Sequence, residues 1–507
     1  MAAAAAAVYL AWDPPSADLA AQQFRTDLFE REGFTLFSTA WYGGHHTPGY
    51  SVLFPPLGAL LGPRLVAAIA AVLATACVAA LCGDERGRVA GLAFVPGIMA
   101  SLVSGRLAFT LGAGFAAGAV LAAARGRPWL AALGGFLTAL ASPVAAAFAA
   151  LAGAALWGAA RERDPTAGRA GAALVVSAVA PVLFVVVAFP EGGTFPFVFS
   201  AFLPTFVFGV VVAVAAPREW RAVRIGAALY ALVALAAFAI PTPIGGNAAR
   251  LGTLLAGPVA ILALWPRRKV VLAALALPIA YWALQPAVRD WLRAHDDPST
   301  EAAFYAPVAD FLEARQPARV AIPFTQSHGE AFHLARRLPI SRGWERQLDI
   351  ERNELFYEGR LTPERYAGWL YENAIGYVAV PLQLPMDESG EEEKTLALAD
   401  PRPLREVLRT ERWRVFATAD VRPLAEGGAT LTELKPEGFV LNASQPGTNT
   451  IRVRFTPYWA LLEGEGCVEP APGGWTRVRV RARGRIEVGT RFALGRIRAT
   501  SPRCTDD

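Results

Sequence analysis

Long stretches without any charged side chain constrain the fold of this chain more than any other feature of its sequence. Residues 65–82, 170–190 and 194–217 contain no Asp, Glu, Lys or Arg. Each has the length of roughly 20 residues that a helix needs to cross the hydrocarbon core of a bilayer. Stretches of this kind recur through the first part of the chain, so the sequence predicts a bundle of membrane-spanning helices.

The composition supports this reading and bounds the membrane part. Hydrophobic residues make up 54% and charged residues 18% of the 507 residues, whereas about 25% of the residues of a soluble domain are charged. After Asp290 the sequence changes to mixed charges and polar turns. We therefore expect a membrane domain over residues 1–292 and a water-soluble part from residue 299. The net charge of +5 is explained by arginines between the apolar segments, so we expect a lipid bilayer and no nucleic acid as a partner.

The apolar segments define about 11 candidate spans. They lie at residues 1–12, 64–82, 89–104, 107–124, 129–142, 143–160, 170–189, 197–216, 224–240, 251–265 and 270–288. Lys and Arg are retained in cytoplasmic loops. The basic residues in the loops on each side of the membrane can therefore be counted to orient the chain. One side holds 13 basic residues: Arg86, Arg88, Arg125, Arg127, Arg161, Arg163, Arg169, Arg218, Arg221, Arg224, Arg267, Arg268 and Lys269. The other side holds only four: Arg25, Arg31, Arg106 and Arg250. This bias predicts a multi-pass protein of the plasma (inner) membrane with a cytoplasmic N-terminus and an extracytoplasmic C-terminal domain.

Two segments leave alternatives open. Residues 1–12 are short for a span, and a cleaved signal peptide is the alternative, although no basic region precedes the alanines. The pair at 129–160, broken at Ser142–Pro143, is alternatively one kinked helix. We keep residues 1–12 as a span and 129–160 as two spans. Only this number of spans leaves all the arginine-rich loops on one side of the membrane.

The outer loop over residues 13–54 carries most of the candidate chemistry. Residues 16–32 place Leu19, Phe24 and Leu28 at helical spacing, which predicts an amphipathic helix on the membrane surface. Asp13 and Asp18 are candidate general bases, because transfer of a group to a hydroxyl needs a carboxylate that accepts its proton. A solvated carboxylate at a helix end is the alternative for both.

Several aromatic and histidine side chains follow in the same loop. We select Trp41, Tyr42, His45, His46 and Tyr50 as candidates for binding substrate. Two adjacent histidines point in different directions on a regular element, so we predict no metal site and no cofactor there. A place in a glycine-rich turn is the alternative for the two histidines.

These features resemble the GT-C superfamily of membrane glycosyltransferases, which use polyprenyl-phosphate sugars as donors. Asp13 directly after the first helix, the 16–32 helix and the segment Phe54-Pro55-Pro56-Leu57 occupy the places of that superfamily's first outer loop, and the stretch from Ser104 is similar to bacterial members. The chain lacks the Asp-Glu pair of protein mannosyltransferases and the Trp-Trp-Asp signature of oligosaccharyltransferases. We therefore do not expect it to use the acceptors of those enzymes.

The resemblance implies an inverting transfer of a sugar, of the arabinofuranose or mannose type, to a cell-envelope glycan or glycolipid at the extracytoplasmic face. It implies Asp13 as the catalytic base, with Asp18 as the alternative. It also requires cations that hold the donor phosphate at the outer helix ends, where Arg106 and Arg250 lie. Snorkelling to the interface is the alternative role for both arginines.

The C-terminal part predicts two regions. Alternating helix and strand patterns over residues 299–412 predict an α/β region. Short strands with period-two alternation over residues 413–507 predict a β-sandwich or jelly-roll-like region. In that region the arginines between 477 and 485 are a candidate face for polysaccharide or phosphate, and Cys467 and Cys504 are expected to form a disulfide outside the cytoplasm.

Two other classes of function remain as alternatives. One is a transporter or flippase, although we see neither inverted repeats nor charged residues at mid-membrane depth. The other is a catalytically inactive scaffold with a glycan-binding outer domain.

Overall fold

The chain forms two compact units. The computed structural model describes residues 1–83, 85–160, 162–399, 403–497 and Cys504. The first unit contains residues 1–22, 50–186 and 192–295, and the second contains residues 23–49, 187–191 and 296–507. Helix α2 (Ala17–Glu32) contributes residues to both units. The orientation prediction included Arg161, which lies outside the described residues.

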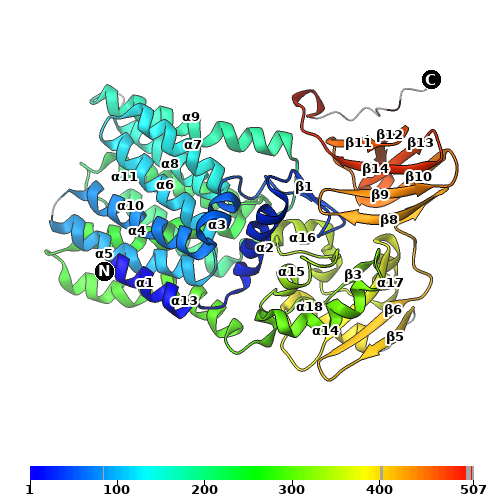
Figure 1. Ribbon diagram of the computed structural model, residues 1–507. Coiled ribbons are helices and arrows are strands. Elements are labelled where there is room, and N and C mark those ends of the chain that lie inside the picture. Colours follow the sequence, from blue (N-terminus) through cyan, green and yellow to red (C-terminus); the bar gives the residue numbers. More distant parts are fainter. Residues whose placement is uncertain (84, 161, 400–402, 498–503, 505–507) are drawn as a thin grey trace. The chain divides into compact units, whose positions relative to one another are not determined.

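The first unit is a bundle of apolar helices (Figure 1). Its helices are α1 (Ala2–Trp12), α3 (Phe54–Leu61), α4 (Pro63–Cys82), α5 (Glu85–Val103), α6 (Leu107–Ala124), α7 (Pro128–Ala141), α8 (Pro143–Ala160), α9 (Pro165–Ala188), α10 (Phe199–Ala215), α11 (Arg221–Ala239), α12 (Ala249–Leu264) and α13 (Lys269–Ala294). Among the described residues, eight helices are long and apolar enough to cross a membrane, the turn Gly245–Ala248 being counted with α12. The other three predicted segments are shorter apolar helices: α1, α7 and α10. All the predicted segments are therefore helical.

The segment at 129–160 is two helices rather than one. Ser142 has an extended backbone (φ −162°, ψ 120°) and separates α7 from α8. The ring of Pro143 removes a backbone donor, which is tolerated at the first position of a new helix. The two helices contact each other, and both pack on α6.

Small residues set the spacing of the helices. A Cβ atom added to Gly153 of α8 would lie 2.8 Å from the carbonyl oxygen of Gly171 of α9, and one added to Gly171 would lie 2.7 Å from that of Gly153. The two backbones therefore touch at this crossing. Interfaces of small residues are a common way for membrane helices to associate, because lipid removes the hydrophobic drive between them.

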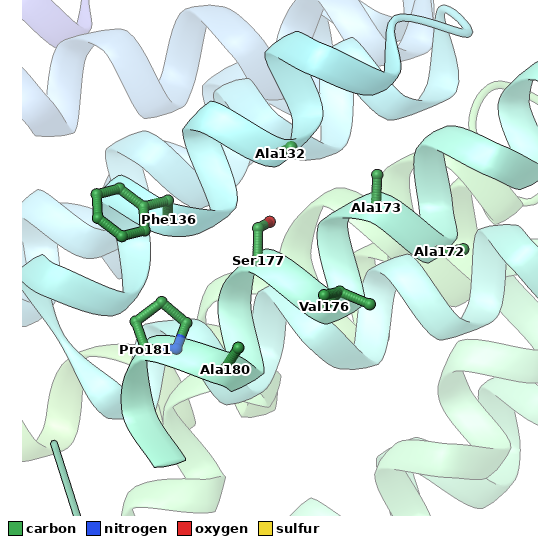
Figure 2. A pocket seen from close by; sticks show the side chains of 8 residues that line it. All are labelled: Ala132, Phe136, Ala172, Ala173, Val176, Ser177, Ala180 and Pro181. Atoms are coloured by element: carbon green, nitrogen blue, oxygen red, sulfur yellow. The ribbon is translucent and has the colours of Figure 1, made fainter. Parts of the chain in front are cut away.

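An open apolar groove of about 600 Å³ lies between α7 and α9 (Figure 2). It is lined by Ala132, Phe136, Ala172, Ala173, Val176, Ser177, Ala180 and Pro181. The Ser177 hydroxyl donates to the Leu174 carbonyl oxygen at 3.2 Å. The groove thus offers hydrocarbon surface to its surroundings and is not the place for polar chemistry.

The second unit begins with an α/β region. Its sheet has the strand order β3-β4-β6-β5, with β3 (Arg319–Ala321), β4 (Ile375–Pro381), β5 (Leu404–Arg409) and β6 (Trp413–Thr418). Its helices are α14 (Ala302–Glu313), α15 (Glu330–His333), α16 (Arg346–Arg352), α17 (Pro363–Glu372) and α18 (Glu388–Leu398). Strand β6 was grouped with the sandwich by its alternation. It belongs instead to this sheet, because its partners on both sides are β4 and β5.

The predicted β-sandwich is present in the second unit. Figure 1 shows this strand-rich region. One sheet has the order β12-β13-β10-β7 and the other β11-β14-β9-β8, and side chains of both form one core. The strands are β7 (Ala425–Glu426), β8 (Ala429–Lys435), β9 (Gly438–Ala443), β10 (Gly447–Arg454), β11 (Trp459–Glu463), β12 (Gly466–Ala471), β13 (Trp475–Val480) and β14 (Gly484–Thr490). The expected disulfide joins Cys467 of β12 to Cys504.

Residues 37–46 contribute a short hairpin to this unit. Its strands are β1 (Phe37–Ser38) and β2 (His45–His46). The Phe37 ring is 1% exposed within the sandwich core and contacts Trp459 at a centroid distance of 5.1 Å. The Thr39 N–H donates to the Pro436 carbonyl oxygen at 2.9 Å. Residues before the second membrane helix therefore complete a domain that ends the chain.

Candidate functional site

Five charged side chains of the first unit lie where helices begin or end. Asp13 follows the last residue of α1, Arg64 lies in the first turn of α4, and Arg106 precedes α6. Arg250 lies in the first turn of α12, and Asp290 lies in the last turns of α13. Contacts among these residues, described below, place them at one end of the bundle.

Asp13 is tied to the start of α4. Its backbone is left-handed (φ 50°), and its N–H caps α1 by donating to the Tyr9 carbonyl oxygen. The Arg64 guanidinium lies 2.5 Å from the Asp13 carboxylate and also donates to the Pro14 carbonyl oxygen at 2.8 Å. The Asp13 side chain nevertheless remains 69% exposed. Arg64 therefore engages one oxygen of a carboxylate that is otherwise largely exposed to solvent.

Asp18 lies in a cluster with Arg106 and Asp290. The Arg106 guanidinium is 3.7 Å from the Asp18 carboxylate and 3.9 Å from that of Asp290. A Cβ atom on Gly105 would lie 2.6 Å from the Leu19 backbone nitrogen, so only glycine lets this turn approach the start of α2 so closely. Both ion-pair distances exceed hydrogen-bond length. Arg106 Nε is buried without a hydrogen-bond partner among the described residues.

Arg250 adds a second cation to this cluster. Its guanidinium lies over the Phe109 ring at 5.1 Å, and it interacts electrostatically with Arg106, Asp18, Tyr50 and Asp290. Within the described ranges, no side chain makes an ion pair or a hydrogen bond with the Arg250 guanidinium.

The hydroxyl of Tyr50 is fixed by helix α2. The Gln22 amide donates to it at 2.8 Å. The side chains of Asp18, Arg106, Arg250, Tyr50 and Asp290 therefore form one polar site, here called the helix-end cluster.

The helix-end cluster suits an oxyanion. Guanidinium groups bind phosphate through several N–H donors at once, and these two arginines are not consumed by internal hydrogen bonds. Asp18 and Asp290 place two carboxylates beside these arginines. Among the described residues, no three His, Cys, Asp or Glu side chains are placed to hold a metal ion, and we derive no step from one.

Trp41 and Tyr42 pack inside the second unit. Trp41 stacks on Phe24 with a centroid distance of 4.1 Å, and its indole N–H donates to the Ala331 carbonyl oxygen at 3.0 Å. The Tyr42 hydroxyl donates to the Gly343 carbonyl oxygen and accepts from the Glu345 N–H. Both side chains are buried. The contacts of both aromatic side chains are therefore those of side chains packed in the interior of a domain.

The two adjacent histidines do point in different directions. His45 stacks on Trp41 at 5.2 Å and is 1% exposed. Burial lowers the pKa of its imidazole to about 3, so the ring is neutral near pH 7. His46 Nδ1 lies 2.8 Å from the Glu191 carboxylate, and its Nε2 lies 3.0 Å from the Thr456 hydroxyl.

Glu191 anchors the histidine pair. Burial raises the pKa of its carboxyl, but the hydrogen bond with His46 and the charge of Arg352 outweigh burial and leave the pKa below its ordinary value. Arg352 lies 3.4 Å from the same carboxylate. The carboxylate is therefore charged at neutral pH and, through His46, holds the hairpin in place within the second unit.

The chain was compared with family models, curated proteins and solved structures. No protein-family model matches the chain. No curated protein matches it either. Among solved structures, that of the arabinofuranosyltransferase AftD from Mycobacteria is similar with a TM-score of 0.49 and 18% sequence identity. The match covers 90% of this chain and 41% of AftD, so the chain spans about two fifths of that protein's length.

The structure divides the predicted site residues into two groups. Asp18, Arg106, Arg250 and Tyr50 come together in the helix-end cluster, and Asp13 lies at the same end with Arg64. Trp41, Tyr42, His45 and His46 lie in the second unit. The arginines of β13 are also engaged: Arg477 and Arg479 both pair with Glu469.

Three residues of these clusters were missed by sequence reasoning. Asp290 lies where the mixed-charge region begins, and no local sequence feature distinguishes it from the charged residues next to it. Gln22 looked like a polar position on an amphipathic helix. Glu191 follows a span directly, and that position was the only available signal.

Proposed function

We propose that this chain is a membrane glycosyltransferase. It transfers a sugar, of the arabinofuranose or mannose type, from a polyprenyl-phosphate donor to a cell-envelope glycan or glycolipid. The observation that carries the proposal is the helix-end cluster, in which two arginines with unused N–H donors lie beside two carboxylates at the end of an apolar bundle. A lipid carrier with a phosphate head requires this combination of apolar helices and cations.

The chemistry follows from the charges of the cluster. Asp18 accepts the proton of the acceptor hydroxyl, and the hydroxyl oxygen attacks C1 of the sugar. The bond between C1 and the phosphate oxygen breaks as the new bond forms, so the configuration at C1 inverts. The electron pair leaves with the polyprenyl phosphate, whose negative charge Arg106 and Arg250 stabilise.

Asp18 is our first candidate for the base, and Asp13 is the second. Asp18 lies beside both arginines, where the phosphate would bind. Asp13 is more exposed, but Arg64 occupies one of its oxygens at 2.5 Å. The reaction would take place at the extracytoplasmic face, as the arginine bias of the loops predicts.

Sugar transfer by the purified chain in lipid nanodiscs tests the proposal. The donor is a synthetic polyprenyl-phosphoryl arabinofuranose or mannose, and mass spectrometry detects the glycosylated acceptor. General acid–base catalysis contributes about 10²–10⁴-fold to a rate, so Asp18→Asn should reduce transfer by about that factor. Glu30→Gln, an exposed change on the same helix, should leave transfer unchanged.

Two outcomes would contradict the proposal. If Asp13→Asn and Asp18→Asn, singly and together, transfer sugar at the wild-type rate, the cluster does not supply the base. If the wild-type chain moves a labelled donor across a vesicle membrane without forming product, it is a flippase instead.

A further inference from the structure

The segment Arg491 to Arg496 exposes apolar side chains that a water-soluble domain would normally bury. It follows β14 and has the sequence RFALGR. The Phe492 side chain is 45% exposed and that of Leu494 is 68% exposed. Large apolar side chains that are exposed together, with polar residues around them, indicate an interaction surface.

An aromatic cluster holds this segment next to residues 187–191. The Phe492 ring lies 6.1 Å from that of Phe189 and 5.5 Å from that of Tyr458, as centroid distances. The Tyr458 hydroxyl donates to the Ala188 carbonyl oxygen at 2.6 Å, and the Arg491 N–H donates to the Tyr458 carbonyl oxygen at 2.9 Å. All these residues belong to the second unit.

Residues 187–189 continue a membrane-spanning helix. Helix α9 runs from Pro165 to Ala188 and is one of the candidate spans. Its apolar side chains remain exposed as far as Val186, which is 58% exposed. The helix therefore reaches the membrane surface near its last residues, and Phe189 is the first residue beyond it. Because the Phe492 ring contacts that of Phe189, Phe492 lies next to the residue that directly follows α9.

The charges of the segment fit the same surroundings. Neither Arg491 nor Arg496 makes an ion pair with a carboxylate in the part of the chain that the structure describes. Burial and the charge of Arg491 lower the pKa of the Arg496 guanidinium. The Arg496 guanidinium donates to the Tyr458 and Trp459 carbonyl oxygens, both at 3.2 Å. Neutral carbonyl groups do not balance its charge, so these two neighbouring cations favour an anion near them. Phosphate headgroups supply such anions, and arginines near an anionic lipid surface are attracted to it.

We propose that residues 491–496 form a membrane anchor of the second unit, with Phe492 and Leu494 inserted among the lipid headgroups and Arg491 and Arg496 bound to anionic lipid phosphates. Amphipathic segments bind in this way, with apolar side chains in the interface and basic ones at the phosphates. The anchor is independent of the function proposed above.

Fluorescence of a label at residue 494 tests the anchor. The full-length chain with Cys77→Ala, Cys82→Ala and Leu494→Cys is labelled with a polarity-sensitive dye and placed in nanodiscs that contain phosphatidylglycerol. Lipids with a nitroxide at the headgroup level should quench this label. The matched control is Val421→Cys, a 41% exposed position of the same unit, which should not be quenched.

Further quenching measurements distinguish binding to lipid phosphate from binding to free phosphate. Arg491→Gln with Arg496→Gln, or nanodiscs of phosphatidylcholine alone, should reduce the quenching at least twofold, whereas millimolar inorganic phosphate should leave it unchanged. Equal quenching at residues 494 and 421 overturns the anchor. Displacement of the label by inorganic phosphate alone would mean that the arginines bind free phosphate rather than lipid.

Discussion

At the scale of single residues, the arginines of this protein differ in what occupies their guanidinium groups. Arg342 in the second unit is fully buried and bonds to Asp349 at 2.7 Å and to Glu393 at 3.2 Å, with the Phe324 ring 3.9 Å away. Among the described residues, no side chain bonds to the Arg250 guanidinium, which lies over the Phe109 ring at 5.1 Å. Arg342 is therefore a structural group, whereas Arg250 keeps its donors available for a ligand.

The first residue-scale prediction concerns Arg250. Arg250→Gln removes one cation from the proposed phosphate site, and a hydrogen bond to a charged group contributes about 1.5–3 kcal/mol. The KM for the polyprenyl-phosphate donor should therefore rise roughly 10-fold to 100-fold, as steady-state kinetics will measure. Arg293→Gln, an exposed change at the end of α13, is the control. An unchanged KM for the Arg250 variant would remove it from the site.

The second prediction concerns Glu393. Burial raises the pKa of its carboxyl to about 7, although the charge of Arg342 opposes this. The folded protein therefore holds this proton more tightly than the unfolded chain, and the contribution of Glu393 to stability falls as the pH rises from about 4.5 to 7. Glu393→Gln should flatten the decline of Tm over this range. Glu392→Gln, an exposed change next to it, should keep the wild-type slope, and equal slopes for both variants would contradict the assignment.

Sequence reasoning selected only some of the residues that form the helix-end cluster, for a physical reason. Asp18, Arg106 and Arg250 could be predicted because charged groups next to apolar spans are costly and few. Asp290 could not be predicted, since its role depends on a contact with Arg106 that is far away in the chain. For His45 and Trp41, composition identified unusual residues but could not distinguish packing from binding.

At the scale of elements, apolar periodicity was a good guide to helices and a partial guide to strands. The span predicted at 107–124 coincides with α6, and β8 lies in the region 413–507 where short strands were predicted. Strand β12 lacks the apolar alternation because it contains Pro470 and the buried Glu469. It lies at the edge of its sheet, where proline is tolerated. Pairing partners, as for β6, cannot be deduced from alternation alone.

One prediction belongs to the crossing of α8 and α9. Gly171→Leu places a side chain where the carbonyl oxygen of Gly153 leaves 2.7 Å for a Cβ atom. Overpacking of this kind costs about 1–3 kcal/mol, so the purified protein should have a lower Tm in detergent. Gly118→Leu is the matched control, because no atom lies within 4 Å of a Cβ atom there. If the two variants have the same Tm, the result contradicts the close approach of α8 and α9.

At the scale of the whole molecule, the second unit is assembled from three separate parts of the chain. Residues 23–49 supply Phe37 to the sandwich core and His46 to Glu191, which itself comes from residues 187–191. The arginine bias and the apolar runs predicted a bundle with a soluble C-terminal domain. They could not predict that the first outer loop completes that domain, because such pairing leaves no periodic signal.

A truncation tests this arrangement. Residues 296–507 expressed alone should expose the surface that Phe37 covers and should aggregate or bind a hydrophobic dye. Fusing residues 33–49 to that fragment through a flexible linker should restore a monomer, as size-exclusion chromatography will show. A monodisperse fragment with a cooperative melt would contradict the contribution of the loop.

The pairing of Leu36 with Glu437 also bears on how the protein is made. The Leu36 N–H donates to the Glu437 carboxylate across 401 positions of the chain. At a synthesis rate of 5–20 residues per second, the ribosome reaches Glu437 roughly 20–80 s after Leu36. During that interval the hairpin is already translated while the sandwich that receives it does not exist. Maturation of this protein therefore ends with a late capture step, and a chaperone that shields Phe37 until then would raise its yield.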